Sequence, residues 1–166
     1  TGLRLGTATA KGLAFPSGKM CIGVSSVAAL AQNAYPFDGL VCPVINARRG
    51  QFFTGLFDFS SDKTEQMVGD CMMMKDEIIE NVRRYNKKVV FVGSGADEFC
   101  SAVDTAVRPS GISAYESAYS VAVIAYRKYV TATEKERESF TANLLNPVYL
   151  RKPQAERELE EKMDHK

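Results

Sequence analysis

The sequence contains no tryptophan and a single histidine, His165, which stands next to the C-terminal residue. A zinc or iron site needs a set of His, Cys, Asp or Glu ligands at suitable spacing, and no such set is present. A Ser-His or Cys-His catalytic pair needs an imidazole held in a core, which a terminal residue does not supply. A Ser-Lys arrangement or a carboxylate pair stays open, although no spacing favours either. We therefore expect no metal, no cofactor and no catalytic residue.

Cysteine is scarce, and the four present lie far apart without a Cys-x-x-Cys pair. Cys21 and Cys42 fall inside apolar runs, where a cysteine behaves as a small buried hydrophobe. Long hydrophobic runs are missing as well, since no stretch approaches the ~20 apolar residues of a membrane helix. No signal-peptide pattern is present either. These features predict reduced thiols in a cytoplasmic protein with no membrane partner.

A surplus of charge is also missing, because 21 Lys and Arg residues against 20 Asp and Glu residues leave a net charge of +1. Gripping nucleic acid requires a clear basic surplus on one face. The composition therefore disfavours nucleic-acid binding by the chain alone and leaves room only for a local basic patch. The 166 residues, 45% of them hydrophobic, suffice for one compact domain or two small lobes.

Helical and extended patterns alternate along the chain. Residues with helical patterning are 2–15, with Thr1 as a candidate N-cap, 27–34 after Ser25, 75–85, and 115–130. Residues expected to form strands are 19–24, 40–45, 51–59, 88–92 and 148–151. Met72, Met73 and Met74 are read as core filler or a strand edge. The mixture, with a β-hairpin at 40–59, predicts an α/β or α+β fold with a mixed sheet, followed from Gln154 by a charged tail.

Gly93, Ser94 and Gly95 follow the expected strand at 88–92 and precede a helical pattern. Glycines let backbone amides approach a phosphate, and the start of a helix favours an anion. The segment lacks the full Gly-x-Gly-x-x-Gly pattern. It is therefore either a plain tight turn or a weak nucleotide-binding loop.

Arg48 and Arg49 occupy the tip of the expected hairpin. Their guanidinium forks suit carboxylates and phosphates. They are either solvated turn residues or a contact to RNA or to a partner protein.

Small residues recur every fourth position in the first helical pattern, at Gly2, Gly6, Ala10 and Ala14. This spacing places them in one stripe, which lets a second element approach the helix backbone closely. Two glycines inside a helix each cost about 1 kcal/mol relative to alanine, so the sequence indicates that close approach is needed. The second element is either the chain's own sheet or another helix, in the same chain or in a partner.

Four blocks of the sequence together resemble the TsaB family. The first block is residues 1–6 (Thr-Gly-Leu-Arg-Leu-Gly) together with Ala10-Lys11-Gly12-Leu13-Ala14. The second block is Val24-Ser25-Ser26 together with Ala28-Ala29-Leu30-Ala31. Residues 44–51 are similar to the family's Asp-Ala-Arg hairpin, and residues 147–151 with 154–156 to its closing strand. The blocks keep the family's order and spacing over nearly the whole chain.

The resemblance implies an actin-like ATPase fold built from two RNase-H-like lobes. Residues 1–36 would be the remainder of the first lobe, 37–145 a largely complete second lobe, and 146–166 the closing strand and tail. The family implies a cytoplasmic, noncatalytic activator of a TsaD-type subunit in threonylcarbamoylation of tRNA. A TsaE-type ATPase joins that assembly, and tRNA is reached through the complex. The alternative is a residual nucleotide-binding enzyme or peptidase of the glycoprotease-like superfamily.

The resemblance places a partner interface on the first helix, and we expect it to include Leu3, Arg4, Gly6, Ala10, Lys11 and Leu13. The strands, helix and Gly-Pro-Gly-Ser-Phe loop with which the family begins are absent, so the chain is expected to be truncated at its start. The missing helix normally completes the docking and homodimer surface, so a swapped copy or another partner could use the exposed stripe. Asn46 replaces the usual Asp, which removes a negative charge beside the two arginines.

Overall fold

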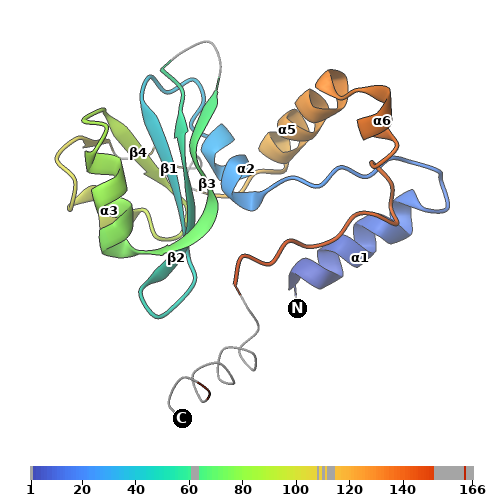
Figure 1. Ribbon diagram of the computed structural model, residues 1–166, viewed down its shortest axis with the longest axis horizontal. Coiled ribbons are helices and arrows are strands. Elements are labelled where there is room, and N and C mark those ends of the chain that lie inside the picture. The colour runs from blue at the N-terminus through green and yellow to red at the C-terminus, as the bar shows by residue number, and fades with distance from the viewer. Residues whose placement is uncertain are drawn as a thin grey trace.

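The computed structural model describes residues 2–60, 64–107, 109, 111, 115–151 and 163. Its centre is a five-stranded sheet with the strand order β3-β2-β1-β4-β5 (Figure 1). The strands are β1 (Leu40–Asn46), β2 (Gln51–Asp58), β3 (Glu65–Met74), β4 (Val89–Val92) and β5 (Ala106–Val107). The expected α/β fold with a mixed sheet is confirmed.

The central strand β1 is a continuous apolar run buried on both faces, as its sequence predicts. It pairs antiparallel with β2, with Leu40 opposite Asp58 and Asn46 opposite Phe52, which confirms the hairpin. It pairs parallel with β4, with Leu40 opposite Val89. The C-terminal ends of β1 and β4 therefore meet at one edge of the sheet.

The outer strand β3 was not predicted as a whole, and only its last residues, Met72 to Met74, were read as a possible strand edge. It pairs antiparallel with β2, with register shifts near Leu56. Its sequence carries Glu65, Asp70 and Gly69, residue types that are depleted in strands. An edge strand tolerates them because one side of its backbone needs no partner strand.

Helices cover both faces of the sheet. On one face, α3 (Lys75–Arg83) buries Ile78 and Val82 against a core that includes Phe52 and Phe91. On the other, α2 (Ser26–Gln32) buries Val27 and Leu30 against Val41 and Phe57. Both helices were predicted, and Ser25 caps α2 by accepting bonds from the amides of Val27 and Ala28.

The longest described helix, α5 (Ala118–Thr131), is also confirmed, and it packs beside α2. Its single buried residue is Ser120, whereas Tyr119 and Tyr126 are 77% and 67% exposed. These two tyrosine side chains therefore face outward. Two short helices, α4 (Asp97–Cys100) and α6 (Glu134–Arg137), complete the described helical segments.

The first helix, α1 (Gly2–Ala14), forms as predicted but lies apart from the sheet, beside residues 140–151 (Figure 1). We call residues 140–151 the closing segment. The strands predicted at 19–24 and 148–151 are wrong, because neither stretch joins the sheet of the described residues. Residues 19–24 instead run along the closing segment and α5, where the Cys21 amide donates to the Phe140 carbonyl (3.0 Å) and Lys128 Nζ to the Gly23 carbonyl (2.9 Å). An apolar, extended pattern gives a strand only where a free sheet edge is within reach.

The predicted cap at Thr1 and nearly all of the charged tail from Gln154 lie outside the described residues. Among the described helices, none has the length and apolar content needed to cross a bilayer.

Candidate functional site

The parallel pairing of β1 and β4 brings two of the three sequence-predicted sites together. The hairpin tip (residues 46–50) follows β1, and the turn at 93–96 follows β4. The Asn46 amide donates a hydrogen bond to Ser94 Oγ (3.1 Å), and the Gly95 amide donates to the Val44 carbonyl (2.9 Å). The turn therefore supports the base of the hairpin tip.

Packing requires both glycines of this turn. Gly93 has φ +107°, and a Cβ there would lie 2.8 Å from the Val44 carbonyl oxygen. A Cβ at Gly95 would lie 2.6 Å from Cε1 of Phe52. The amides of Gly95 and Ala96 already donate to protein carbonyls, so fewer amides face a phosphate than a nucleotide loop needs. The weak nucleotide-binding hypothesis stays a prediction, and close packing already explains the glycines.

Arg48 and Arg49 are both exposed and both adopt positive φ, 66° and 56°, ahead of Gly50 at 72°. The Arg48 amide donates to Asn46 Oδ1 (2.8 Å), and the Gln51 amide donates to the Arg48 carbonyl (3.1 Å). An Asp at position 46 could accept the same bond, so Asn46 keeps the turn and removes its negative charge.

The closing segment reaches the same tip. Arg151 Nη1 donates to the Ala47 carbonyl (2.9 Å), across 104 positions of sequence. The sequence did not predict this contact, because a short Val-Tyr-Leu-Arg stretch gives no indication of which distant loop it meets. Three arginines therefore belong to this end of the molecule.

The third predicted site, α1, divides into two sides. On one side, Arg4 Nε donates to Tyr149 Oη (2.8 Å) and the guanidinium stacks over the Tyr149 ring at 5.6 Å. Further along the same side, Lys11 Nζ donates to the Leu145 carbonyl (3.1 Å), and Ala14 is buried. Arg4 and Lys11, two of the six predicted interface residues, thus contact the chain's own closing segment.

The other side of α1 is open. The other four predicted interface residues, Leu3, Gly6, Ala10 and Leu13, are all exposed there together with Gly2. A Cβ added at Gly2 or Gly6 would meet nothing within 4 Å. We call these five residues the open face.

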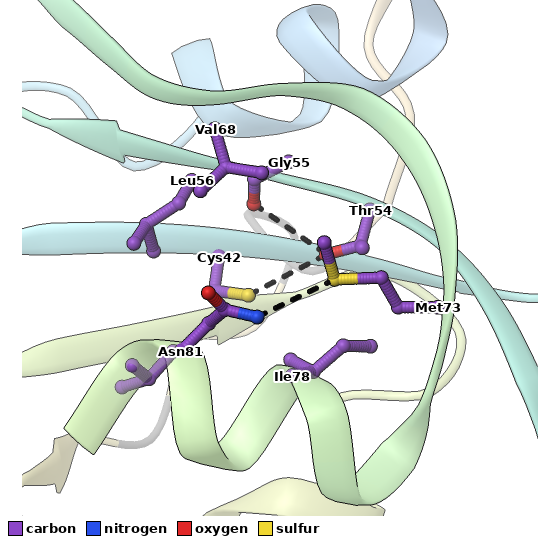
Figure 2. A pocket seen from close by; sticks show the side chains of 9 residues that line it. Cys42, Thr54, Gly55, Leu56, Val68, Met73, Ile78 and Asn81 are labelled. Atoms are coloured by element: carbon purple, nitrogen blue, oxygen red, sulfur yellow. Dashed lines mark hydrogen bonds between the residues drawn. The ribbon is translucent and has the colours of Figure 1, made fainter. Parts of the chain in front are cut away.

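Cys42, Thr54 and Asn81 line a small cavity between α3 and the sheet (Figure 2). Its volume of about 10 Å³ is that of roughly one water, too small for a substrate. Burial raises the pKa of the Cys42 thiol to about 12, so the thiol stays protonated near neutral pH and is a poor nucleophile. Within the described ranges, no group of three or more His, Cys, Asp or Glu side chains could hold a metal ion.

These features define an α/β protein that exposes the two hairpin arginines and most of the predicted interface residues on its surface. A family model described as "TsaD: tRNA N6-adenosine threonylcarbamoyltransferase" matches residues 1–159. The chain is 30% identical over 156 residues to the tRNA threonylcarbamoyladenosine biosynthesis protein TsaB of Bacillus subtilis. The chain therefore belongs to the TsaB type of this family.

Two solved structures share the fold. One is an uncharacterized protein with similarity to peptidase YeaZ from Pseudomonas aeruginosa, with a TM-score of 0.68 and 19% identity. The other is YeaZ from Pseudomonas aeruginosa, with a TM-score of 0.68 and 18% identity. Each match covers 89% of this chain and 67% of the solved chain, which supports the expected actin-like ATPase fold.

The chain does not span the whole of its relatives. It covers 66% of the length of the Bacillus subtilis protein, while 94% of the chain itself is matched.

Proposed function

We propose that this chain is a noncatalytic binding subunit in tRNA threonylcarbamoyladenosine biosynthesis and docks on a TsaD-type subunit. The name of the Bacillus subtilis relative supports a role in this pathway. The family model is named for the transferase, which supports a partner subunit homologous to this chain. The observation that carries the proposal is the open face of α1, where small and apolar residues are exposed.

The geometry of α1 favours docking on this face. Residues 4, 7, 11 and 14 recur at helical spacing and turn toward the closing segment, and Thr7 and Lys11 among them are half-buried. Gly2, Gly6 and Ala10 recur every four residues on a different side, so a partner helix can approach the backbone closely there. Leu3 and Leu13 are exposed on the same side as these small residues and supply apolar area for burial.

Arg4 and Lys11 have a supporting role in this proposal. Their bonds to Tyr149 and to the Leu145 carbonyl fix α1 on the closing segment and orient its open face outward. A TsaE-type ATPase and tRNA would join through the complex, in the cytoplasm. A homodimer through the same face is the competing arrangement.

Bulky substitutions on the open face test the docking proposal. Gly6→Leu and Ala10→Leu should weaken binding of the TsaD-type subunit roughly tenfold or more, because overpacking a close contact costs about 1–3 kcal/mol. Gly12→Leu is the matched control, since Gly12 is also open to solvent but lies about 120° around the helix from Gly6. Binding is measured by titration calorimetry, with this chain and with a version extended at its N-terminus.

The control separates docking from folding. Outside the helix's own backbone, a Cβ at Gly6 or Gly12 would meet nothing within 4 Å in the described residues, and Ala10 is exposed. All these variants should therefore keep the fold. Equal affinity of the Gly6, Ala10 and Gly12 variants would place the partner elsewhere. If the wild type forms a homodimer that Ala10→Leu dissociates, while the TsaD-type subunit binds unchanged, the open face serves self-association.

A further inference from the structure

We propose that Arg48 and Arg49 bind the phosphate backbone of RNA, as an auxiliary contact of the docked subunit. The proposal rests on the proposed function, since tRNA, named in the pathway of the Bacillus subtilis relative, supplies the polyanion. It goes further by assigning the RNA contact to the hairpin tip, which projects beyond the end of the sheet (Figure 1).

Charge at the tip is positive and locally uncompensated. Residues 39–57 contain both arginines and no Asp or Glu. Asp58 pairs with Leu40 at the far end of the hairpin, roughly 20 Å away along the strand. Asp76 and Asp97 on neighbouring elements are exposed, and in the described part of the chain neither forms an ion pair with Arg48 or Arg49. Both guanidiniums therefore keep their donors for an external anion.

The backbone of the tip is costly for arginine. The hydrogen bond from the Gln51 amide to the Arg48 carbonyl encloses Arg49 and Gly50, both at positive φ, and Arg48 itself is also left-handed. Turns of this kind favour Asn, Asp or Gly, which reach positive φ more easily. Asn, Asp or Gly would form this turn at a lower backbone cost. The arginines are therefore explained by the function of their guanidinium groups and not by the shape of the turn.

The tip is also held in place from below. The Asn46 side chain accepts a hydrogen bond from the Arg48 backbone amide, and the Asn46 backbone amide donates one to Ser94 Oγ. Arg151 donates a hydrogen bond to the Ala47 carbonyl. A preorganised loop loses less conformational entropy on binding. Two adjacent arginine forks on a fixed turn match the closely spaced phosphates of a nucleic-acid strand, and each can bind one phosphate through paired bonds.

The experiment compares tRNA binding by the wild type and by the double variant Arg48→Asn/Arg49→Asn. Fluorescence anisotropy with labelled tRNA is recorded from about 20 to 200 mM salt. Asn accommodates positive φ, so the variant should keep or raise the melting temperature. The control Arg83→Gln/Arg84→Gln removes the same charge from the last residue of α3 and from its C-cap. There Arg84 pairs with Glu80, and Arg83 donates to the Ala102 carbonyl.

We expect the Asn variant to lose roughly tenfold or more in affinity at low salt. The slope of log K against log salt should fall by about 1.4, or about 0.7 for each lost phosphate contact. The control should change neither quantity by as much. Wild-type and Asn variant with the same affinity and slope, or a wild type that binds no tRNA at low salt, would overturn the proposal.

A second readout separates this proposal from the docking proposal. Binding of the TsaD-type subunit is measured without RNA, and the Asn variant should bind it as the wild type does. If the Asn variant loses the protein partner and keeps tRNA, the arginines contact carboxylates of a protein and the RNA assignment is wrong. If the open-face variants lose the partner while tRNA binding persists, the two surfaces act independently and the RNA assignment stands.

Discussion

Gly95 and Gly6 show how the same residue type serves opposite purposes in this chain. A Cβ at Gly95 would lie 2.6 and 2.9 Å from two ring carbons of Phe52. Phe52 is itself buried and packs edge-to-face against Phe99. Around Gly6 the same atom would meet nothing within 4 Å. Gly95 is thus a packing glycine, whereas Gly6 carries a helix cost that packing against the described residues does not explain.

Alanine substitutions at the two glycines should therefore have opposite signs. Gly95→Ala should lower the free energy of unfolding by about 1–3 kcal/mol, because Phe52 must shift in a packed core. Gly6→Ala should raise it by about 0.5–1 kcal/mol, the helix advantage of alanine. Urea denaturation followed by circular dichroism measures both. A Gly95→Ala protein as stable as the wild type would show that the ring moves freely and that the turn is not tightly packed.

At the scale of elements, α1 is only weakly anchored to the rest of the described chain. It buries one residue, Ala14, and touches the closing segment through Arg4 and Lys11. By contrast, β1 has five consecutive buried residues and a partner strand on each side. Local stability follows burial, so α1 should open far more often than the sheet.

Hydrogen exchange should reveal this difference. Amides of α1 should exchange much faster than those of β1 and β4, and Tyr149→Phe should speed α1 further by removing the acceptor of the Arg4 bond. The control is Tyr126→Phe on the exposed side of α5, which should leave α1 unchanged. Exchange of α1 as slow as that of β1 would mean that α1 is held by contacts other than these.

The elements that the sequence predicted share a strong local signal. The apolar runs of β1 and β4 and the amphipathic spacing of α3 each identify their element without tertiary information. β3 was missed as a strand because its polar residues suit only an edge, and its edge position depends on β2. The segments 19–24 and 148–151 have strand-like sequences, yet pairing depends on a neighbour that no local pattern specifies.

The candidate sites were predictable as residues and not as an arrangement. Arg48, Arg49 and Gly93 to Gly95 were identified separately, and the parallel β1–β4 pairing that joins them is a long-range feature. The division of α1 into a bonded side and an open face depends on Tyr149, which is 145 positions away from Arg4. Spacing along one helix shows which residues share a side but not which partner each side meets.

At the scale of the whole molecule, the alternative to a binding subunit is a nucleotide-binding enzyme, and one measurement distinguishes the two. We expect millimolar ATP with magnesium to leave the melting temperature unchanged, because the amides of Gly95 and Ala96 are already bonded and α4 has four residues. A ligand present at 100 times its dissociation constant stabilises a protein by about 2.7 kcal/mol. In a chain of this size that corresponds to roughly 5–10 °C. A shift of that size would favour a nucleotide-binding enzyme over a binding subunit.

The contact between Arg4 and Tyr149 also limits the order in which the elements of the chain can fold. The β1–β2 hairpin closes over a short loop and can form early, whereas α1 must wait until residue 149 is available. During synthesis from the N-terminus, α1 is therefore made before the hairpin and settles after it. In that interval Leu3, Leu13 and the rest of the open face are accessible to other chains. A partner that binds this helix could engage it before the rest of the molecule is complete.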